Sequence, residues 1–324
     1  MWRQPKTYGD EFHKIQQDDL VVVRADRRNL APGDTARAEV YFSHYSGRPL
    51  SGALVDWKLE GTELQSGFAL PTVGAATSAK VGDIQFTVPG VNAPLHRLLK
   101  VTVTLNGHIL SEDSLDFYFY PPQTLDLPPP VSFHDPAGRL RRLVNEMHAR
   151  GYQAPSGRES FPVLISSAWD DEVKQTIRNG GIVILMANDA MTLAPGLEIV
   201  PRSKDNLDGN WISSFQWIRK NHAPFAGIGF ETLAGFEANP ITSNTVLRGV
   251  LPEYFDDVLA GMFYGWIHSN VGTLVQAQYG KGRLLVSTFS LGSTYGSDPF
   301  ATRLLDALMT YAVSRFSPKF QIPQ

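Results

Sequence analysis

The spacing of hydrophobic residues changes once along this chain, and the change coincides with a proline-rich segment. Before that segment, apolar residues recur at every second position, which is the period of a β-strand with one buried face. After it, continuous apolar runs alternate with segments of helical period. Residues 121–130 hold five prolines, and proline cannot donate to a sheet ladder. We therefore predict two domains, 1–124 and 125–324.

The first domain has the pattern of a sandwich of short strands. Apolar residues alternate with polar ones through 36–42, 55–59, 84–88 and 99–105, and Asn106-Gly107 then supplies the pair of residues that a tight hairpin needs. About seven such strands in about 105 residues, with no helical period, predict an immunoglobulin-like β-sandwich. Residues 1–16 have no clear period and form an N-terminal extension.

The second domain has the pattern of a layered α/β fold. The apolar runs 161–165 and 182–186 are typical of strands buried on both faces. Helices are predicted to begin at Asp135-Pro136, at Asp170 or Asp171, and at Asp298-Pro299, and residues 279–282 form a hairpin turn. This alternation predicts a flavodoxin-like α/β domain with an antiparallel element. Residues 195–247 interrupt it and are interpreted as an excursion from the fold.

Composition excludes several classes of function. The 29 Lys and Arg residues against 32 Asp and Glu leave a net charge of −3. No basic cluster accompanies it, so neither a nucleic acid nor a membrane is expected as a partner. No apolar run reaches the roughly 18 residues of a membrane-spanning helix. The absence of cysteine removes disulfides, thiolate metal sites and thiol nucleophiles. The eight histidines show no HxxxH or HxH pair, so neither a metal nor another cofactor is predicted.

Three aspartates are the candidate catalytic residues: Asp170, Asp189 and Asp208. Two carboxyl groups that face each other across a cleft can perform acid–base hydrolysis of a glycoside. Asp170-Asp171-Glu172 also fits a helix N-cap followed by an acidic first turn, and Asp256-Asp257 is open to the same interpretation. Both interpretations of the acidic residues stay open at this point.

Aromatic residues gather within the excursion and shortly after it. The carbohydrate-binding candidates are Trp211, Trp217, His222 and Trp266. Exposed aromatic rings can form a platform for the apolar faces of sugar rings. The alternative is a satellite core beneath a long loop. Exposure of the tryptophans distinguishes the two.

Two motifs in the second domain resemble those of a known superfamily. Ile177 to Leu185 resembles the "V-x-x-G-G-x-L-V-L" helix-to-strand junction of glutamine-amidotransferase-like domains, and Tyr279 to Ser287 resembles their closing segment. With an immunoglobulin-like sandwich in front that contains Ala25 to Asp34, the chain resembles the C-terminal, non-catalytic region of large bacterial glycoside hydrolases related to family 2. The resemblance implies a role in carbohydrate metabolism and an extracytoplasmic location, either periplasmic or secreted.

The chain departs from these relatives at the positions that carry chemistry. Ala187-Asn188-Asp189 follows the second buried strand, where amidotransferases need a cysteine, so glutaminase activity is excluded. The catalytic barrel of family 2 enzymes needs about 250 residues of repeated βα units, which these residues do not provide. The chain itself is therefore expected to lack catalytic residues while being part or partner of a glycoside hydrolase.

Three hypotheses for the function follow. The first is a non-catalytic accessory or assembly module of a carbohydrate-active enzyme, whose partner is a catalytic barrel or its own oligomer, with an oligosaccharide as a further candidate ligand. The second is a free-standing, carboxylate-dependent hydrolase acting on carbohydrate. The third is a purely structural oligomerisation unit.

Overall fold

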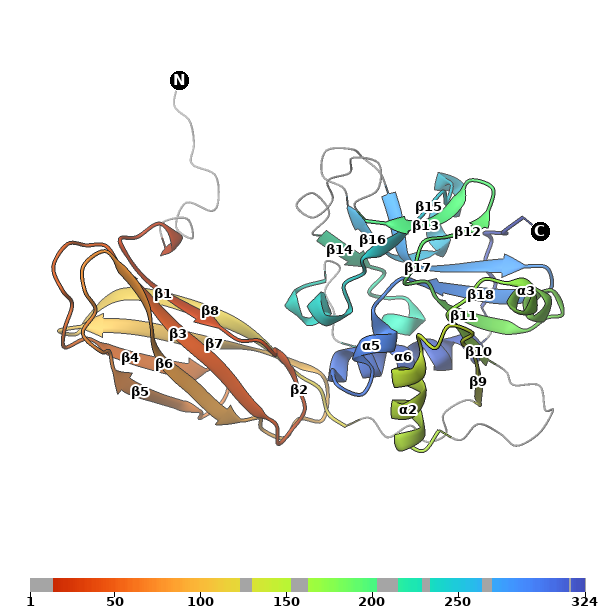
Figure 1. Ribbon diagram of the computed structural model, residues 1–324. Coiled ribbons are helices and arrows are strands. Elements are labelled where there is room, and N and C mark those ends of the chain that lie inside the picture. The colour runs from red at the N-terminus through yellow and green to blue at the C-terminus, as the bar shows by residue number, and fades with distance from the viewer. Residues whose placement is uncertain are drawn as a thin grey trace, which may run out of the picture. The chain divides into compact units, whose positions relative to one another are not determined.

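The chain forms two compact units, Met1–Pro122 and Gln123–Gln324, in a computed structural model (Figure 1). The structure describes residues 14–122, 130–152, 163–202, 215–228, 234–263, 270–314 and 316–323. Within these ranges the protein is mostly β, with three sheets and few helices. One sheet is mixed and partly parallel. The second unit therefore has fewer helices than the layered α/β fold that its sequence predicts.

Two sheets of the first unit share one hydrophobic core. The first sheet has three strands in the order β1 (Asp19–Arg24), β3 (Thr35–His44) and β6 (Thr77–Thr87). The second has five strands in the order β2 (Asn29–Leu30), β8 (His108–Phe119), β7 (Leu95–Leu105), β4 (Leu54–Leu59) and β5 (Gln65–Ala69). Alternate residues of both sheets, such as Phe42 and Phe117, belong to the same buried cluster. Trp57 packs against it and stacks on Phe86, with ring centroids 5.9 Å apart.

The predicted hairpin at Asn106-Gly107 is confirmed. Both residues have positive φ, 52° and 80°, and they join β7 to β8 in an antiparallel pair. The strand β1 was not predicted. Its outward N–H groups, on Val21 and Val23, donate to Ser111 Oγ (3.0 Å) and Asp113 Oδ2 (2.8 Å) on β8 of the other sheet. Side chains therefore tie β1 to the sheet that its backbone does not join.

Gly82 lies in β6, where a side chain would collide with the half-buried Phe68 ring, which packs against the core. A Cβ atom there would lie 2.5 Å from the Phe68 ring. We expect Gly82→Ala to lower the free energy of unfolding by about 1–3 kcal/mol, because the ring must shift within a packed site. Gly90→Ala is the matched control, since its Cβ meets nothing within 4 Å. Urea unfolding of both variants tests this, and equal midpoints would contradict the close packing at Gly82.

The second unit is built on a ten-stranded sheet. Its parallel strands are β9 (Val131–His134), β10 (Val163–Ser166), β11 (Ile182–Met186) and β18 (Gly282–Ser287). Its antiparallel strands are β12 (Met191–Ala194), β13 (Leu197–Pro201), β14 (Phe215–Ile218), β15 (Thr245–Arg248), β16 (Val258–Phe263) and β17 (Asn270–Tyr279). The hairpin predicted at 279–282 joins β17 to β18.

The interpretation of residues 195–247 as an excursion is wrong for their described part. This segment contains β13, β14 and β15, which pair with β15, β16 and β17 as an antiparallel continuation of the sheet. These strands are four or five residues long. A run that short has too few alternations to be recognised by its period.

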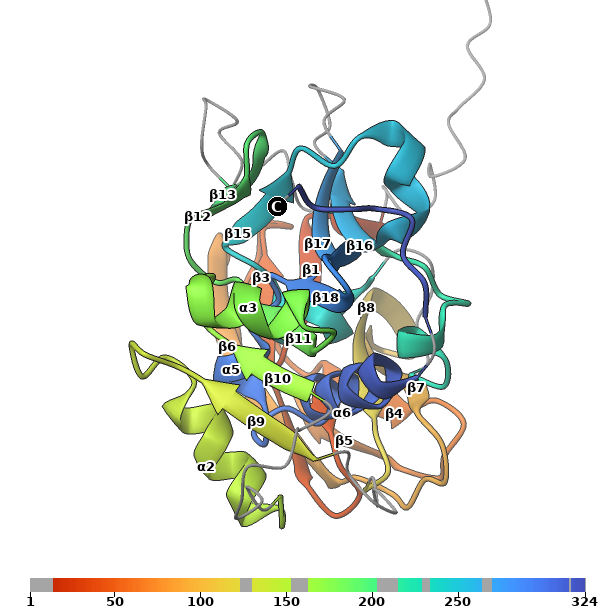
Figure 2. The same ribbon diagram turned by 90° about the vertical axis from the view of Figure 1, so that its right-hand side faces the viewer.

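The described part of the second unit contains four helices and three 3₁₀ turns, and two of the helices contact the parallel strands. The helices are α2 (Arg141–Ala149), α3 (Asp171–Arg178), α5 (Leu291–Thr294) and α6 (Pro299–Val313), with 3₁₀ turns η2 (Ala223–Phe225), η3 (Phe236–Ile241) and η4 (Pro252–Asp257). Val173 and Ile177 of α3 pack on the face of β11 that carries Val183. The long helix α6 contributes nothing to that cluster and contacts β10 and β11 from the opposite face (Figure 2).

Two of the three predicted helix starts are confirmed. Asp170 accepts a hydrogen bond from Val173 N, and Asp298 accepts one from Ala301 N, as N-caps do. The start predicted at Asp135 is wrong, since α2 begins at Arg141. Asp135 instead accepts from the N–H groups of Arg139 and Leu140 in the turn that precedes the helix.

A C-terminal tail, residues 316–323, lies along the end of β17. Gln278 N donates to Phe320 O (2.8 Å), and Ile322 N donates to Gln278 O (2.9 Å). Asp257, which is only 3% exposed, accepts from the N–H groups of Lys319 and Phe320 through Oδ2. Its Oδ1 accepts from Gln276 Nε2. The tail therefore contributes Phe320 and Ile322 to the core that also contains α3.

Candidate functional site

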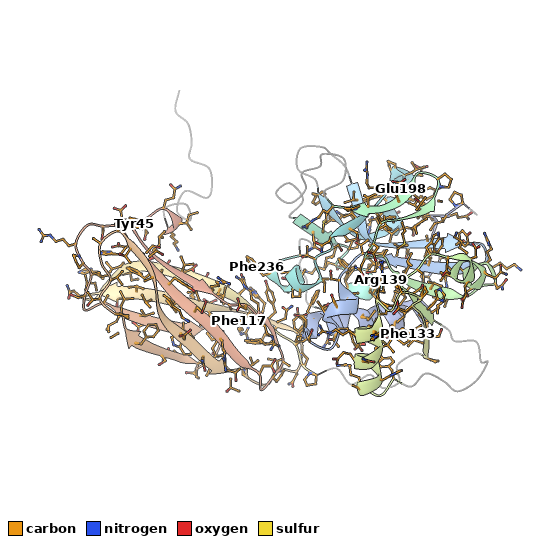
Figure 3. All side chains as sticks on the ribbon, viewed as in Figure 1. Tyr45, Phe117, Phe133, Arg139, Glu198 and Phe236 are labelled. Atoms are coloured by element: carbon orange, nitrogen blue, oxygen red, sulfur yellow. The ribbon has the colours of Figure 1, made fainter. Side chains whose placement is uncertain are left out.

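A small cavity lies where the parallel strands end. We call it the carboxyl-edge crevice. It measures about 210 Å³, and its polar lining residues are Arg139, Ser167, Asn188, Asp189, Asn244, Ser290 and Ser293. They follow β9, β10, β11 and β18 or belong to loops beside them, and Figure 3 marks the position of Arg139. Open α/β sheets commonly bind their ligands at this edge.

The candidate catalytic aspartates are engaged in separate contacts. Asp170 caps α3 and lies 2.7 Å from Nε2 of His134. Burial would raise the pKa of Asp170, but the hydrogen bonds from His134 and Val173 N outweigh it and lower that pKa. Asp189 forms an ion pair with Arg139 at the crevice. Asp208 lies outside the described residues, and no hydrogen bond or ion pair among the described residues joins Asp170 to Asp189.

Ser167, at the end of β10, is not placed for nucleophilic catalysis. Its hydroxyl donates to Asp135 Oδ1 over 2.6 Å. Burial opposes ionisation of Asp135, but the bonds from Ser167 and two backbone N–H groups lower its pKa, which makes it a weak base. The ring nitrogens of His134 face Asp170 and Glu172 instead, at 2.7 and 3.6 Å. Ser167 therefore has no histidine partner among the described residues.

An apolar groove of about 640 Å³ lies at the ends of β14 and β16. We call it the aromatic groove. Its lining consists of Trp217, Ile218, Arg219, Lys220, Asn221, His222, Phe255 and Phe263. The Trp217 ring centroid lies 5.3 Å from that of Phe255 and 6.2 Å from that of Phe263. The structure thus brings two of the predicted carbohydrate-binding residues, Trp217 and His222, to one groove.

The exposed aromatic surface of this groove belongs to phenylalanines and not to the predicted tryptophan. Trp217 is 6% exposed, whereas Phe255 is 39% and Phe263 is 46% exposed. Trp217 packs over Gly261, where a Cβ atom would lie 2.7 Å from the indole. Trp217 belongs to the hydrophobic core, as the satellite-core interpretation predicts, and it forms the floor of the groove. Trp211 and Trp266 lie outside the described residues.

His222 is half-buried at one side of the groove. Burial lowers its pKa, the nearby Arg219 lowers it further, and Asp257 opposes both. The imidazole is therefore neutral at neutral pH. Its ring makes an edge contact with Tyr311, with centroids 5.3 Å apart. The Tyr311 hydroxyl donates to Gln276 Oε1, so the groove is linked to the residues that hold the C-terminal tail.

Phe255 was missed by the sequence analysis. It lies in η4, and the Arg219 guanidinium stacks 5.0 Å above its ring. Arg219 directly follows β14, and it also donates to the carbonyls of Phe255 and Val258. These bonds fix η4 against the end of β14. The local signal was an aromatic pair, Tyr254-Phe255, between Pro252-Glu253 and Asp256-Asp257. That pattern does not distinguish exposed rings from buried ones.

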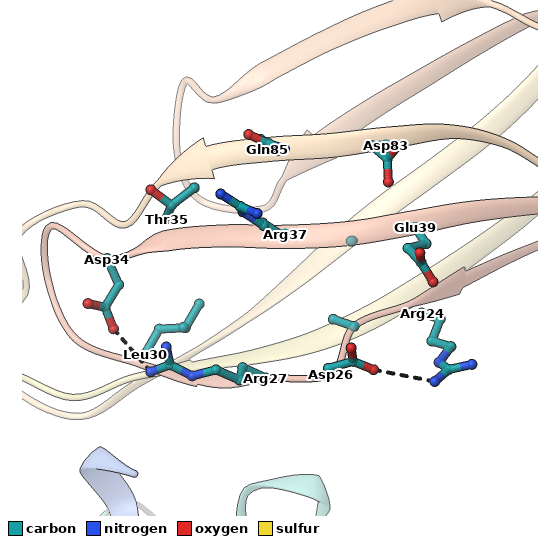
Figure 4. Close-up of a pocket in the computed structure, with 12 residues that line it drawn as sticks. Arg24, Asp26, Arg27, Leu30, Asp34, Thr35, Arg37, Glu39, Asp83 and Gln85 are labelled. Atoms are coloured by element: carbon teal, nitrogen blue, oxygen red, sulfur yellow. Dashed lines mark hydrogen bonds and ion pairs between the residues drawn. The ribbon is translucent and has the colours of Figure 1, made fainter. Parts of the chain in front are cut away.

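The first unit has a charged hollow of about 620 Å³ on its three-stranded sheet. Figure 4 shows the ion pairs that Arg24 forms with Asp26 (3.4 Å) and Arg27 with Asp34 (3.5 Å). Lys80 bridges Glu39 and Asp83 beside it. Because opposite charges are paired there, the hollow has the character of a solvated polar face.

The described part of the chain contains no group of three or more His, Asp or Glu side chains that could hold a metal ion. Within the same residues, no helix has the length and apolar character needed to cross a membrane.

Comparisons with known proteins give distant structural likenesses alone. No family model matches, and no curated protein sequence matches. The CARDB domain of PF1109 from Pyrococcus furiosus is 14% identical over 32% of this chain and 94% of that domain, with a TM-score of 0.27. The Pseudomonas fluorescens alkylpurine DNA glycosylase AlkC is 14% identical over 33% of this chain, with a TM-score of 0.25. This chain covers 31% of that protein.

Parabacteroides merdae β-glucuronidase is also similar, at 10% identity over 50% of this chain and a TM-score of 0.20. The chain covers 24% of that enzyme. These likenesses are too distant to assign a function, and no sequence family is established.

Proposed function

We propose that this protein is a non-catalytic accessory module of a carbohydrate-active enzyme, and that it binds glycan in the aromatic groove. In this proposal the first unit is an immunoglobulin-like sandwich that acts as a spacer. The second is a flavodoxin-like domain of the glutamine-amidotransferase-like type that has lost its thiol. The partner is the catalytic barrel of a glycoside hydrolase or a second copy of the chain.

The exposed rings of Phe255 and Phe263 carry the proposal. They flank a groove whose floor is Trp217, and a groove of about 640 Å³ is large enough for an oligosaccharide segment. Sugar rings present apolar C–H faces to aromatic rings and hydroxyls to polar neighbours. Asn221 and Lys220 line the same groove and provide polar groups at its side. An aromatic surface with a polar side is the combination that a glycan requires.

The contacts of the candidate aspartates, and their positions away from the aromatic groove, favour binding over catalysis. Asp170 caps helix α3 and contacts His134, and Asp189 forms an ion pair with Arg139. Neither aspartate lines the aromatic groove. A glycosidase needs two carboxyl groups about 5–10 Å apart on either side of the scissile bond. The aromatic groove has no carboxyl group among its described lining residues.

Loss of either exposed ring is expected to weaken glycan binding. Phe255→Ala and Phe263→Ala should each raise the Kd for a bound oligosaccharide about tenfold, because each removes an aromatic contact worth about 1.4 kcal/mol. Isothermal titration against plant and bacterial oligosaccharides measures this. Phe236→Ala is the matched control, because Phe236 is 48% exposed on η3 and does not line the groove (Figure 3).

The outcomes separate the competing functions. Binding that Phe236→Ala leaves unchanged and both groove variants weaken supports the proposal. Absence of binding to every glycan, together with a dimer that Phe263→Ala dissociates, would make the groove an oligomer interface. Hydrolysis of a glycan that Asp170→Asn abolishes would replace the proposal with a catalytic one.

A further inference from the structure

We infer that the carboxyl-edge crevice is a second ligand site, which takes one small, neutral, polyhydroxylated molecule of about the size of a monosaccharide. This inference does not depend on the aromatic groove. It is based on which hydrogen-bonding atoms the crevice has left to offer, on its charge and on its size.

The serine hydroxyls of the crevice have already used their hydrogens. Ser167 donates to Asp135 Oδ1 (2.6 Å), Ser290 donates to Thr242 O (3.1 Å), and Ser293 donates to Ser290 O (3.0 Å). A hydroxyl has one hydrogen and two lone pairs. These three side chains can therefore only accept hydrogen bonds from a ligand.

The side-chain amide of Asn188 has also used its hydrogens. Its amide nitrogen donates to the carbonyls of Thr288 (3.0 Å) and Phe289 (3.2 Å), which uses both of its hydrogens. Its Oδ1 therefore remains as an acceptor on an exposed side chain. The crevice thus has several fixed acceptors, and a molecule with many O–H groups complements them. Preorganised acceptors cost a ligand little to engage, because their own partners hold them in place.

The charge of the crevice selects among donor-rich molecules. Its one carboxylate, on Asp189, is paired with the guanidinium of Arg139, so the crevice has no surplus negative charge to attract an ammonium ion. An anion would face the lone pairs of the serines and of Asn188, and the one cationic group of the lining, Arg139, is already paired with Asp189. A neutral polyol avoids both problems. The buried side chains of Leu140 and Met186 also line the crevice and offer apolar surface for C–H groups.

The size of the cavity limits the ligand. At about 210 Å³ the crevice is smaller than the roughly 300–1,000 Å³ of sites that take drug-sized molecules. One sugar ring or cyclitol is the appropriate size, and a chain of sugars is too large. The aromatic groove would then bind a segment of a polysaccharide, and the crevice would bind a free small polyol.

Saturation-transfer NMR on the whole chain tests this with named probes: glucose, galactose, xylose and myo-inositol as polyols, choline as a cation and acetate as an anion. We expect saturation transfer to at least one polyol and to neither ion. Ser293→Trp fills the crevice and should abolish the signal. Ser297→Trp is the matched control, since Ser297 also donates to the carbonyl three residues earlier but does not line the crevice.

A milder variant keeps the test informative if Ser293→Trp fails to fold. The Asn244 side chain lines the crevice and makes no hydrogen bond within the described part of the chain. Asn244→Ala should therefore leave the unfolding midpoint unchanged and weaken polyol binding about threefold to tenfold, as loss of one hydrogen bond does.

Three results would overturn the inference: no signal from any polyol, a signal from choline or acetate in place of the polyols, or a polyol signal that survives Ser293→Trp. The double variant Phe255→Ala, Phe263→Ala keeps this test separate from the proposed function. A polyol signal lost in that variant places the ligand in the aromatic groove, which overturns the second site and supports the first.

Discussion

Asp257→Ala should lower the free energy of unfolding of the second unit by about 3–5 kcal/mol. The carboxyl group accepts three hydrogen bonds in a site that is almost completely buried: from the N–H groups of Lys319 and Phe320, and from the Gln276 amide. Alanine leaves all three donors without a partner. It also removes two of the hydrogen bonds that hold the tail, which places Phe320 and Ile322 in the core.

The neighbouring acid provides the control for this experiment. Asp256 has a 75% exposed side chain, with ion pairs to Arg219 and Lys319 at 3.6 and 3.8 Å. Asp256→Ala should cost no more than about 0.5 kcal/mol, as exposed ion pairs usually do. Guanidinium unfolding followed by tryptophan fluorescence compares the two. A loss below about 1 kcal/mol for Asp257→Ala would mean that the tail is not held through this residue.

Asp306→Ala is expected to produce the second large loss, about 3 kcal/mol or more. Asp306 is fully buried on α6 and accepts hydrogen bonds from Tyr152 (3.2 Å) and Tyr295 (2.9 Å). The Arg150 guanidinium lies 3.4 Å from its other oxygen. The carboxyl group therefore joins the end of α2, the turn after α5 and α6. Without it two buried hydroxyls lose their acceptor.

The same residue should give stability a particular dependence on pH. Burial raises the pKa of Asp306, although Tyr295, Arg150 and Tyr152 act against it. The folded state therefore binds this proton more tightly than the unfolded state, whose pKa is near 3.8. In the window above 3.8 and up to the raised pKa, stability falls as pH increases, and below 3.8 the contribution is fully present.

Asp306→Asn removes that titration while keeping the shape of the side chain. The difference in unfolding free energy between the parent and Asp306→Asn should shift in favour of the asparagine variant as the pH rises from about 4 toward about 7. Tyr295→Phe keeps the titrating group and serves as the comparison. A parent-minus-variant difference that is constant over this range would show that Asp306 does not titrate there.

Elements with long periods or a defined cap were predictable from the sequence. The hairpins at Asn106-Gly107 and at residues 279–282 and the helix starts at Asp170 and Asp298 depend on local chemistry, and the structure contains all four. The strands β13 to β15 depend on tertiary pairing, because each is too short to show its period. The same limit applies to β9, which has four residues, whereas β1 has six and was missed because its Val21-Val22-Val23 run does not alternate.

The candidate site was less predictable than the fold. The sequence predicted Trp217 and His222 as binding residues, and both line the aromatic groove. It did not predict that Trp217 would be buried and that Phe255 would supply exposed surface, because exposure depends on how η4 is fixed by Arg219. Asp257 resembled a helix-capping acid in sequence, but two of its three partners, Lys319 and Phe320, are more than sixty residues away in the tail.

The side-chain bonds from β8 to β1 have a consequence for self-association. An unpaired strand edge offers its N–H groups to any other strand, which is how β-proteins aggregate. At β1 the outward N–H groups of Val21 and Val23 are already bound by Ser111 and Asp113. An incoming strand would have to displace a carboxylate and a hydroxyl before forming its first bonds there. This border of the sheet therefore resists templated growth, although no further strand pairs with its backbone within residues 14–122.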